Sequence, residues 1–234
     1  MVSVNPGLDH QNFIRSFTRL FNADLSWAEQ AERKNHPFSF LTEEIKRLDT
    51  YLLICPSTSG SRQQNLAPTL GEKKLFQHCD TSILSLKETR WPIRHILLVL
   101  QVDDIDVCAE EWAVRVAIAS EATLTILPVI PNVPVMYAEL QQGLPELLDS
   151  NCQLGRHLRQ VAQRLVNWEV SGTFKLRDEP PEWQIRSEIN EGDFDLIIIG
   201  VDFYDPIQKL MMQDLVFPLL CWTTRPILLT QTYP

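Results

Sequence analysis

Short apolar runs alternate with stretches of helical periodicity from residue 94 to the end of the chain. The longest runs are apolar on both faces, which is the pattern of parallel strands that are covered by helices on either side. Five runs have strand length: 94–101, 122–130, 172–178, 194–200 and 225–231. Strands joined through helices need right-handed crossovers and form a parallel sheet. The alternation therefore predicts a five-stranded α/β domain over residues 92–234.

The stretches between these runs carry apolar residues at intervals of three and four, which predicts helices. The predicted buried faces are Ala109, Trp112, Ala113, Val116 and Ala119 in one helix and Leu154, Leu158, Val161, Leu165 and Trp168 in another. Pro180 and Pro181 suit the first turn of a third helix, because proline there loses no helical hydrogen bond. Asp214 is placed to cap a short fourth helix before the last strand.

The first 91 residues follow another pattern, and the predicted domain boundary lies at Trp91-Pro92. Helical spacing of Phe13, Phe17, Leu20 and Phe21 predicts an N-terminal helix. A second amphipathic stretch, 39–55, ends in the apolar run Tyr51 to Cys55. Residues 56–74 have the polar Pro/Gly/Ser composition of a linker, and 81–87 fit either a short strand or a packed extension. Residues 1–91 are thus predicted to form a mainly helical extension.

Charge, hydropathy and cysteine content exclude several classes of protein. The net charge is −9, and residues 92–234 hold 10 Lys+Arg against 20 Asp+Glu, which argues against nucleic-acid binding because that affinity comes from basic side chains. No apolar run reaches the ~18 residues of a membrane span, and the N-terminus lacks a signal-peptide pattern, so we expect a cytoplasmic protein. The five cysteines include no C-x-x-C pair, which argues against disulfide frameworks and zinc sites.

The order of elements resembles the universal stress protein family. The resemblance rests on the long excursion after the second strand, on "RDEPPEWQI" entering the third helix, and on "FDLIIIG" followed by a short helix and "RPILLT". It covers roughly residues 94–231. It implies a sheet in the order 3-2-1-4-5 and a homodimer paired through the last strand, here Pro226 to Gln231. In one subgroup of the family it also implies ATP at the carboxyl edge of the sheet.

The ATP-binding subgroup has three glycines and a hydroxyl residue after strand four, and counted onto this chain these places are Gly200, Phe203, Gln213 and Asp214. One of the four matches. Glycines let backbone N–H groups approach phosphate oxygens, whereas the large side chains obstruct that approach. A carboxylate ~4 Å from a phosphate costs about 4 kcal/mol at an effective dielectric of ~20. The sequence therefore predicts a degenerate nucleotide-binding motif.

The ligand crevice of such a sheet lies beyond the carboxyl ends of its strands, at the switch point between strands one and four. The candidate crevice positions are Gln101, Val102, Asp103, Val129, Gly200, Val201, Phe203, Gln213 and Asp214. Aspartates at 103, 104, 106, 202 and 205 would make this edge negative and repel nucleotides. These aspartates could instead hold Mg²⁺. The plainer interpretation is that Asp106 and Asp214 cap helices while the others lie in solvated loops.

No nucleophile-and-base pattern such as G-x-S-x-G is present, so the chain is not expected to be an enzyme. Five scattered histidines, at 10, 36, 78, 95 and 157, are expected to be structural rather than metal ligands. The apolar last strand would be an aggregation hazard if left bare, so either a second copy or the N-terminal extension is expected to cover it.

The function that these features predict is that of a non-catalytic, dimeric stress or regulatory protein that acts through an unidentified protein partner. The alternative is a protein that binds ATP or AMP, with Mg²⁺, or another small ligand at the carboxyl edge of the sheet. The stress role follows from the resemblance alone, because a fold does not specify a function.

Overall fold

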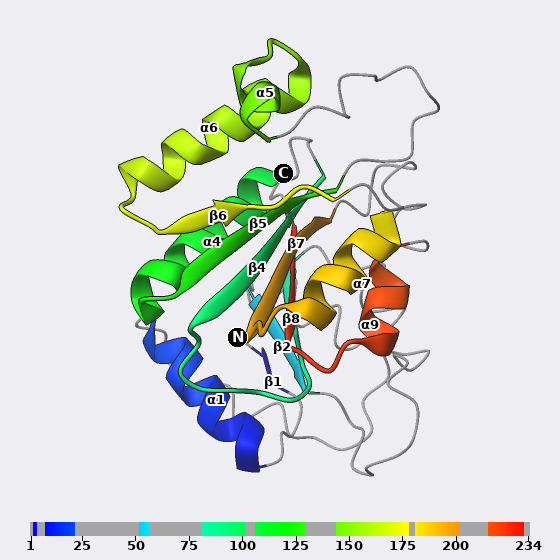
Figure 1. Ribbon diagram of the computed structural model, residues 1–234. Coiled ribbons are helices and arrows are strands. Elements are labelled where there is room, and N and C mark those ends of the chain that lie inside the picture. Colours follow the sequence, from blue (N-terminus) through cyan, green and yellow to red (C-terminus); the bar gives the residue numbers. More distant parts are fainter. Residues whose placement is uncertain are drawn as a thin grey trace.

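The computed structural model describes residues 2–3, 8–21, 52–56, 81–101, 106–129, 144–177, 181–201 and 215–231. Eight strands form one sheet in the order β1-β2-β3-β8-β7-β4-β5-β6 (Figure 1). The strands are β1 (Val2–Ser3), β2 (Leu52–Pro56), β3 (Ser82–Leu86), β4 (His95–Leu100), β5 (Thr123–Pro128), β6 (Gly172–Phe174), β7 (Leu196–Val201) and β8 (Ile227–Gln231). All neighbouring strands are parallel except β3 and β8, which are antiparallel.

Strands β4 to β8 follow the predicted order 3-2-1-4-5. The sheet is larger than the five strands expected, because the first 91 residues contribute three strands. The prediction of a mainly helical extension is thus wrong for the described residues of this segment. The apolar run that ends at Cys55 forms β2, and of the two interpretations of residues 81–87 the strand is correct. The predicted linker falls almost wholly outside the described residues.

Helices cover both faces of the sheet (Figure 1). One face carries α1 (Leu8–Arg19), α4 (Asp106–Ser120) and α6 (Gln153–Asn167), and the other carries α7 (Pro181–Glu191) and α9 (Phe217–Trp222). A short helix that the sequence did not predict, α5 (Leu144–Asp149), precedes α6. Because both faces are covered, β7 is buried along its whole length, as its unbroken apolar run predicted.

The helix faces largely match the periodicity. Buried α6 residues include Leu154, Leu158, Val161 and Leu165. Trp168, expected in the same stripe, lies at the C-cap and is 60% exposed. Ala119 is also exposed, and α9 has Val216 rather than Asp214 at its cap position. Within the described part of the chain every helix is too short or too polar to cross a bilayer.

Strand β8 is paired on both sides within the chain. Ile227 to Leu229 lie opposite β3, and Ile227 to Gln231 lie along β7. A second chain that paired through Pro226 to Gln231 would have to displace β3, which already pairs with Ile227 to Leu229. The predicted homodimer itself stays a prediction. The other expectation, that the N-terminal segment covers β8 within one chain, describes the structure.

Candidate functional site

The carboxyl ends of β4, β5 and β7 meet at the switch point, where the sequence predicted the crevice. The structure describes four of the nine predicted positions there: Gln101, Val129, Gly200 and Val201. The other five lie outside the described residues: Val102, Asp103, Phe203, Gln213 and Asp214. The same is true of the predicted rim aspartates at 104, 202 and 205, so the geometry of this site comes from the first four residues.

Gln101 ties the two switch-point strands together. It follows β4, and its side-chain Nε2 donates a hydrogen bond of 2.6 Å to the carbonyl oxygen of Gly200 in β7. Its backbone N–H donates to Asp106 Oδ1 at 2.9 Å. The residue is 9% exposed. A buried amide thus bridges β4 and β7 at this edge of the sheet through a side-chain hydrogen bond to Gly200.

The neighbouring positions are closed in the same way. Val129 and Val201 are buried, and the N–H of Val129 donates to the carbonyl oxygen of Leu100 at 2.7 Å. Gly200 lies inside β7, paired with Thr230 of β8, instead of opening a turn. No glycine within the described ranges has positive φ. The described backbone at Gly200 and Val201 is therefore strand, and the other three motif positions lie outside the described residues.

Gln231, beside Val201, is a buried polar residue whose side chain is not engaged in the way that of Gln101 is. Gln231 pairs with Val201 at the carboxyl end of β8 and is 3% exposed. Neither its Oε1 nor its Nε2 has a hydrogen-bond partner in the described structure. A buried amide normally finds partners, since an unsatisfied one costs about 1–3 kcal/mol. A small ligand could use this donor and this acceptor.

Of the predicted acidic rim, Asp106 is described, and it does not lie in an open loop. It is the first residue of α4 and is fully buried. Its Oδ1 accepts the hydrogen bond from Gln101, while its Oδ2 lies 3.2 Å from His157 Nε2 on α6. The expectation that Asp106 is structural is thus supported, with His157 as a partner that sequence spacing did not reveal.

His157 belongs to a cluster that joins α6 to α4, here called the α4/α6 cluster: Asp106, Glu110, His157 and Arg164. Glu110 Oε2 lies 2.6 Å from Arg164 Nη2, and Glu110 Oε1 lies 3.8 Å from the His157 ring. The Glu110 side chain is 5% exposed, whereas that of Arg164 is 41% exposed. A buried carboxylate therefore depends on one solvated cation and one titratable ring.

Burial raises the pKa of Glu110 to about 7, and the nearby Arg164 and His157 only partly oppose this shift. The pKa of His157 is raised as well, mainly by its hydrogen bond to Asp106, against the effect of burial. Glu110 thus changes its charge near neutral pH. No sequence signal marked these residues, because they lie on different helices about 50 positions apart.

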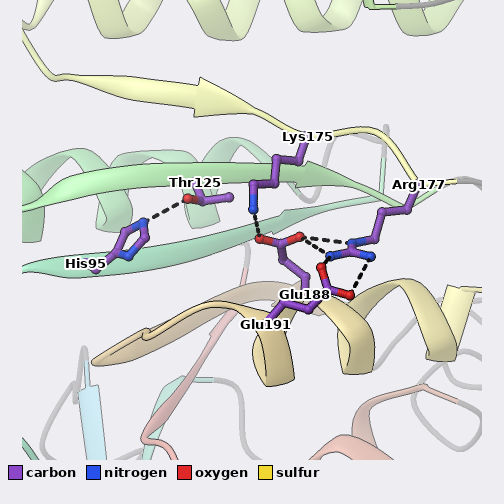
Figure 2. A network of polar contacts seen from close by, with 6 residues as sticks. All are labelled: His95, Thr125, Lys175, Arg177, Glu188 and Glu191. Atoms are coloured by element: carbon purple, nitrogen blue, oxygen red, sulfur yellow. Dashed lines mark hydrogen bonds and ion pairs between the residues drawn. The ribbon is translucent and has the colours of Figure 1, made fainter.

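A second cluster fixes α7 to the segment after β6, and it is here called the β6/α7 cluster: Lys175, Arg177, Glu188 and Glu191 (Figure 2). Glu188 is fully buried, with Lys175 Nζ at 2.6 Å from Oε1 and Arg177 Nη2 at 2.8 Å from Oε2. Arg177 also pairs with Glu191 and lowers the pKa of that carboxyl. Every carboxylate here meets a permanent cation, which is the pattern of a structural network.

Neither cluster resembles a metal centre. Among the residues that the structure describes, no group of three or more His, Cys, Asp and Glu side chains could hold an ion. Neither cluster contains a Ser, Thr or Cys side chain that could act as a nucleophile beside its acidic and basic groups. The Mg²⁺ interpretation of the rim rests on aspartates outside the described ranges, apart from Asp106, which is already paired.

The doubly wound sheet, with its switch point beside β4, defines the class of fold, and solved structures identify it as that of universal stress proteins. A functionally unknown protein from Pseudomonas aeruginosa PAO1 matches with a TM-score of 0.62 at 14% identity, covering 99% of this chain and 81% of that one. A putative universal stress protein from Pseudomonas aeruginosa UCBPP-PA14 gives 0.62 at 14%, covering 99% and 82%.

A universal stress protein from Archaeoglobus fulgidus DSM 4304 gives a TM-score of 0.59 at 12% identity, covering 96% of this chain and 80% of that one. The predicted resemblance is thus confirmed at the level of the fold, and these matches extend over the N-terminal segment that the sequence resemblance left out. No family model matches the sequence, and no curated protein matches it either.

Proposed function

We propose that this chain is a universal-stress-protein-like protein without catalytic activity that acts through protein contacts in the cytoplasm, with its nucleotide crevice closed. The observation that carries the proposal is the Gln101 bridge to Gly200. This side chain occupies the position between β4 and β7 where a ligand would enter. A nucleotide would have to break a buried hydrogen bond and displace a packed side chain before it made any contact of its own.

Charge supports the same proposal. The α/β half of the chain has a net charge of −10, from 10 Lys+Arg against 20 Asp+Glu in residues 92–234. A negative surface lowers the local concentration of polyphosphates. The basic residues of the β6/α7 cluster do not offset this, since Lys175 and Arg177 are engaged by Glu188 and Glu191.

Calorimetric titration of ATP and AMP, with and without Mg²⁺, tests the proposal. We expect no binding by the native protein at millimolar nucleotide, and binding in the micromolar range would overturn the closed crevice. Gln101→Ala removes the bridge and leaves space, whereas Gln101→Leu removes the bridge and keeps the volume. AMP binding should therefore be stronger in Q101A than in Q101L, and each variant should lose about 1 kcal/mol of stability with the lost hydrogen bond.

The second candidate function is the binding of adenine nucleotide or another small ligand at the same edge, and the unpartnered amide of Gln231 favours it. An adenine ring carries both a donor and an acceptor that a glutamine amide can meet. If the native protein binds AMP, Gln231→Leu should abolish the binding while Q101L leaves it within a factor of three. Loss of binding in Q101L alone would instead assign the contact to Gln101.

A further inference from the structure

The N-terminal strands repeat the pairing of the C-terminal strands at a constant sequence offset. Strands β2 and β3 pair in parallel, as do β7 and β8. Adding 144 to both members of a β2/β3 pair gives a β7/β8 pair. The matching pairs are Leu53–Ile83 and Ile197–Ile227, Ile54–Leu84 and Ile198–Leu228, Cys55–Ser85 and Ile199–Leu229, and Pro56–Leu86 and Gly200–Thr230.

The two faces of the sheet follow the same offset. Leu53 and Ile197 pack in the core on the α7/α9 side, and Ile54 and Ile198 pack in the core on the α1/α4 side. A one-residue slip between the halves would exchange these faces. Side-chain direction thus excludes an odd offset and is consistent with the offset of 144 that the strand register gives.

The junction between the halves is symmetric. Across β3 and β8, Leu84 lies opposite Leu228, Ile83 opposite Leu229 and Ser85 opposite Ile227. When the two halves are exchanged by the offset of 144, the pair Ile83–Leu229 becomes Ile227–Ser85. The pair Leu84–Leu228 becomes itself, because 84 and 228 differ by 144. A local two-fold axis therefore passes between Leu84 and Leu228. Such isologous pairing is the geometry in which two copies of one fold meet.

The first strand and helix of each half also correspond. β1 lies beside β2 with Val2 opposite Leu53, as β4 lies beside β7 with Leu97 opposite Ile197. α1 follows β1 as α4 follows β4, and both helices contribute to one core on the same face of the sheet. They meet where the rings of Phe21 and Trp112 lie 5.4 Å apart.

The halves differ in the length of chain between helix and next strand. Positions 20–51, or 32 residues, separate α1 from β2, whereas positions 121–195, or 75 residues, separate α4 from β7. The longer connection holds β5, β6 and the helices α5 to α7. The elements of the longer connection alone span Thr123 to Glu191, which is more than twice the length of the shorter connection.

We propose that residues 1–91 are an incomplete repeat of the α/β domain, and that this repeat occupies on β8 the place that a second subunit would take. The edge of β8 by which this domain would pair with a second copy is then occupied by β3 of the same chain. That edge is not available to a second subunit. This inference goes beyond the proposed function and does not depend on the state of the crevice.

Buried polar contacts also join the segment after β3 to the C-terminal end of α9, as expected of a specific interface. Lys87, directly after β3, is 8% exposed, and its Nζ donates to the carbonyl oxygens of Leu220 and of Thr223, the latter at 2.8 Å, at the C-terminus of α9. A buried ammonium at this end of a helix meets the negative pole of the helix dipole. The N–H of Glu88 also donates to the carbonyl oxygen of Thr224 at 2.8 Å.

Engineered cysteines at the local axis test the proposal on the full chain. Directly opposed antiparallel residues have Cα atoms about 4.5–5.5 Å apart, within reach of a disulfide. The double variant L84C/L228C should form a disulfide within one chain and stay at the monomer mass of 27.0 kDa on a non-reducing gel. If two chains paired through β8 around the same kind of axis, the single variant L228C would crosslink them, because residue 228 would lie opposite itself.

Wild-type protein treated with the same oxidant controls for the five native cysteines. An intrachain link in L84C/L228C, with no covalent dimer of L228C beyond the wild-type level, supports the proposal. Efficient covalent dimers of L228C, or a folded double variant that fails to link, would overturn it.

Should either variant fail to fold, hydrogen exchange on the wild type decides the matter. The β3 amides should then be protected within about tenfold of those of β8, and exchange of β3 at the rate of an unfolded chain would refute the docking.

Discussion

Each of the two charged clusters in the α/β domain contains a buried glutamate, and the two glutamates differ in the cations that surround them. In the β6/α7 cluster Glu188 is fully buried and each of its oxygens faces a permanent cation, Lys175 or Arg177. In the α4/α6 cluster Glu110 is almost as buried, but its close partners are a solvated arginine and a histidine. A second carboxylate, Asp106, lies in the same cluster and disfavours the ionised form of Glu110.

Glu110 shows how burial acts on a carboxylate with few fixed partners. Burial raises its pKa to about 7, and Arg164 is the fixed cation that pairs with it. Glu188 has two cations within hydrogen-bond distance, Lys175 and Arg177. We therefore expect the attachment of α6 to α4 to depend on pH near neutrality through Glu110.

The largest expected effect is the pH dependence that Glu110 contributes. Its folded pKa is about 7, above its ordinary value of 4.5, so the folded state binds the proton more tightly than the unfolded state. Stability from this group is complete below pH 4.5 and is lost as the pH rises through 7. The loss is on the order of 3 kcal/mol from a shift of this size. Urea unfolding at several pH values should show native protein losing this much relative to Glu110→Gln between pH 4.5 and 8.

The matched control for Glu110 is Glu191→Gln, which changes an exposed glutamate whose pKa is lowered instead of raised. That group gains its proton below the same pH window, so E191Q should run parallel to the native protein between pH 4.5 and 8. Parallel curves for E110Q and the native protein would mean that Glu110 is ionised in the folded protein throughout. The contrast between the two clusters would then fail.

The next effect is the cost of removing a fixed cation from Glu188. Arg177→Met leaves a fully buried carboxylate with Lys175 alone, and we expect a loss of about 2 kcal/mol, below the ~3–5 kcal/mol for an ion left wholly unpaired. Lys175→Met is the control, because the Lys175 side chain is 45% exposed and such pairs contribute ~1 kcal/mol or less. Equal losses in urea unfolding at pH 7 would contradict the view that Arg177, the less exposed cation, is the stronger of the two partners of Glu188.

The sequence predicted one half of the sheet and misjudged the other. Residues 196–201 are apolar on both faces and follow a helix, so their place in a parallel sheet was readable from pattern alone. The run ending at Cys55 is just as apolar, but it continues an amphipathic stretch, and a short apolar run in that position cannot be told from the end of a helix. The offset of 144 became visible only when strand pairing supplied the register.

The sequence predicted which strand ends lie side by side, but not the hydrogen bonds that their residues make. Switch-point topology placed Gln101 and Gly200 at one edge, because that follows from strand order. The hydrogen bond that joins them depends on a single rotamer, which no spacing rule contains. His157 shows the same limit, since its contact with Asp106 depends on how α6 crosses α4 and not on any local pattern.

The smallest effect concerns His157, and it separates the histidine from the glutamate within the α4/α6 cluster. The pKa of His157 is raised, chiefly by its hydrogen bond to Asp106, so its stabilisation is complete below pH 6.5 and is lost as the pH rises through the folded value. His157→Gln keeps a hydrogen-bond donor and removes the charge. We expect it to cost about 1 kcal/mol at pH 6, because the glutamine can still donate a hydrogen bond to the buried Asp106, and less at pH 8.5. In urea unfolding, a cost that is equal at both pH values would show that the ring acts through packing alone.

Glu110 and Arg164 face the same ring. The loss of stability in the double variant H157Q/E110Q should therefore be smaller than the sum of the losses in the two single variants.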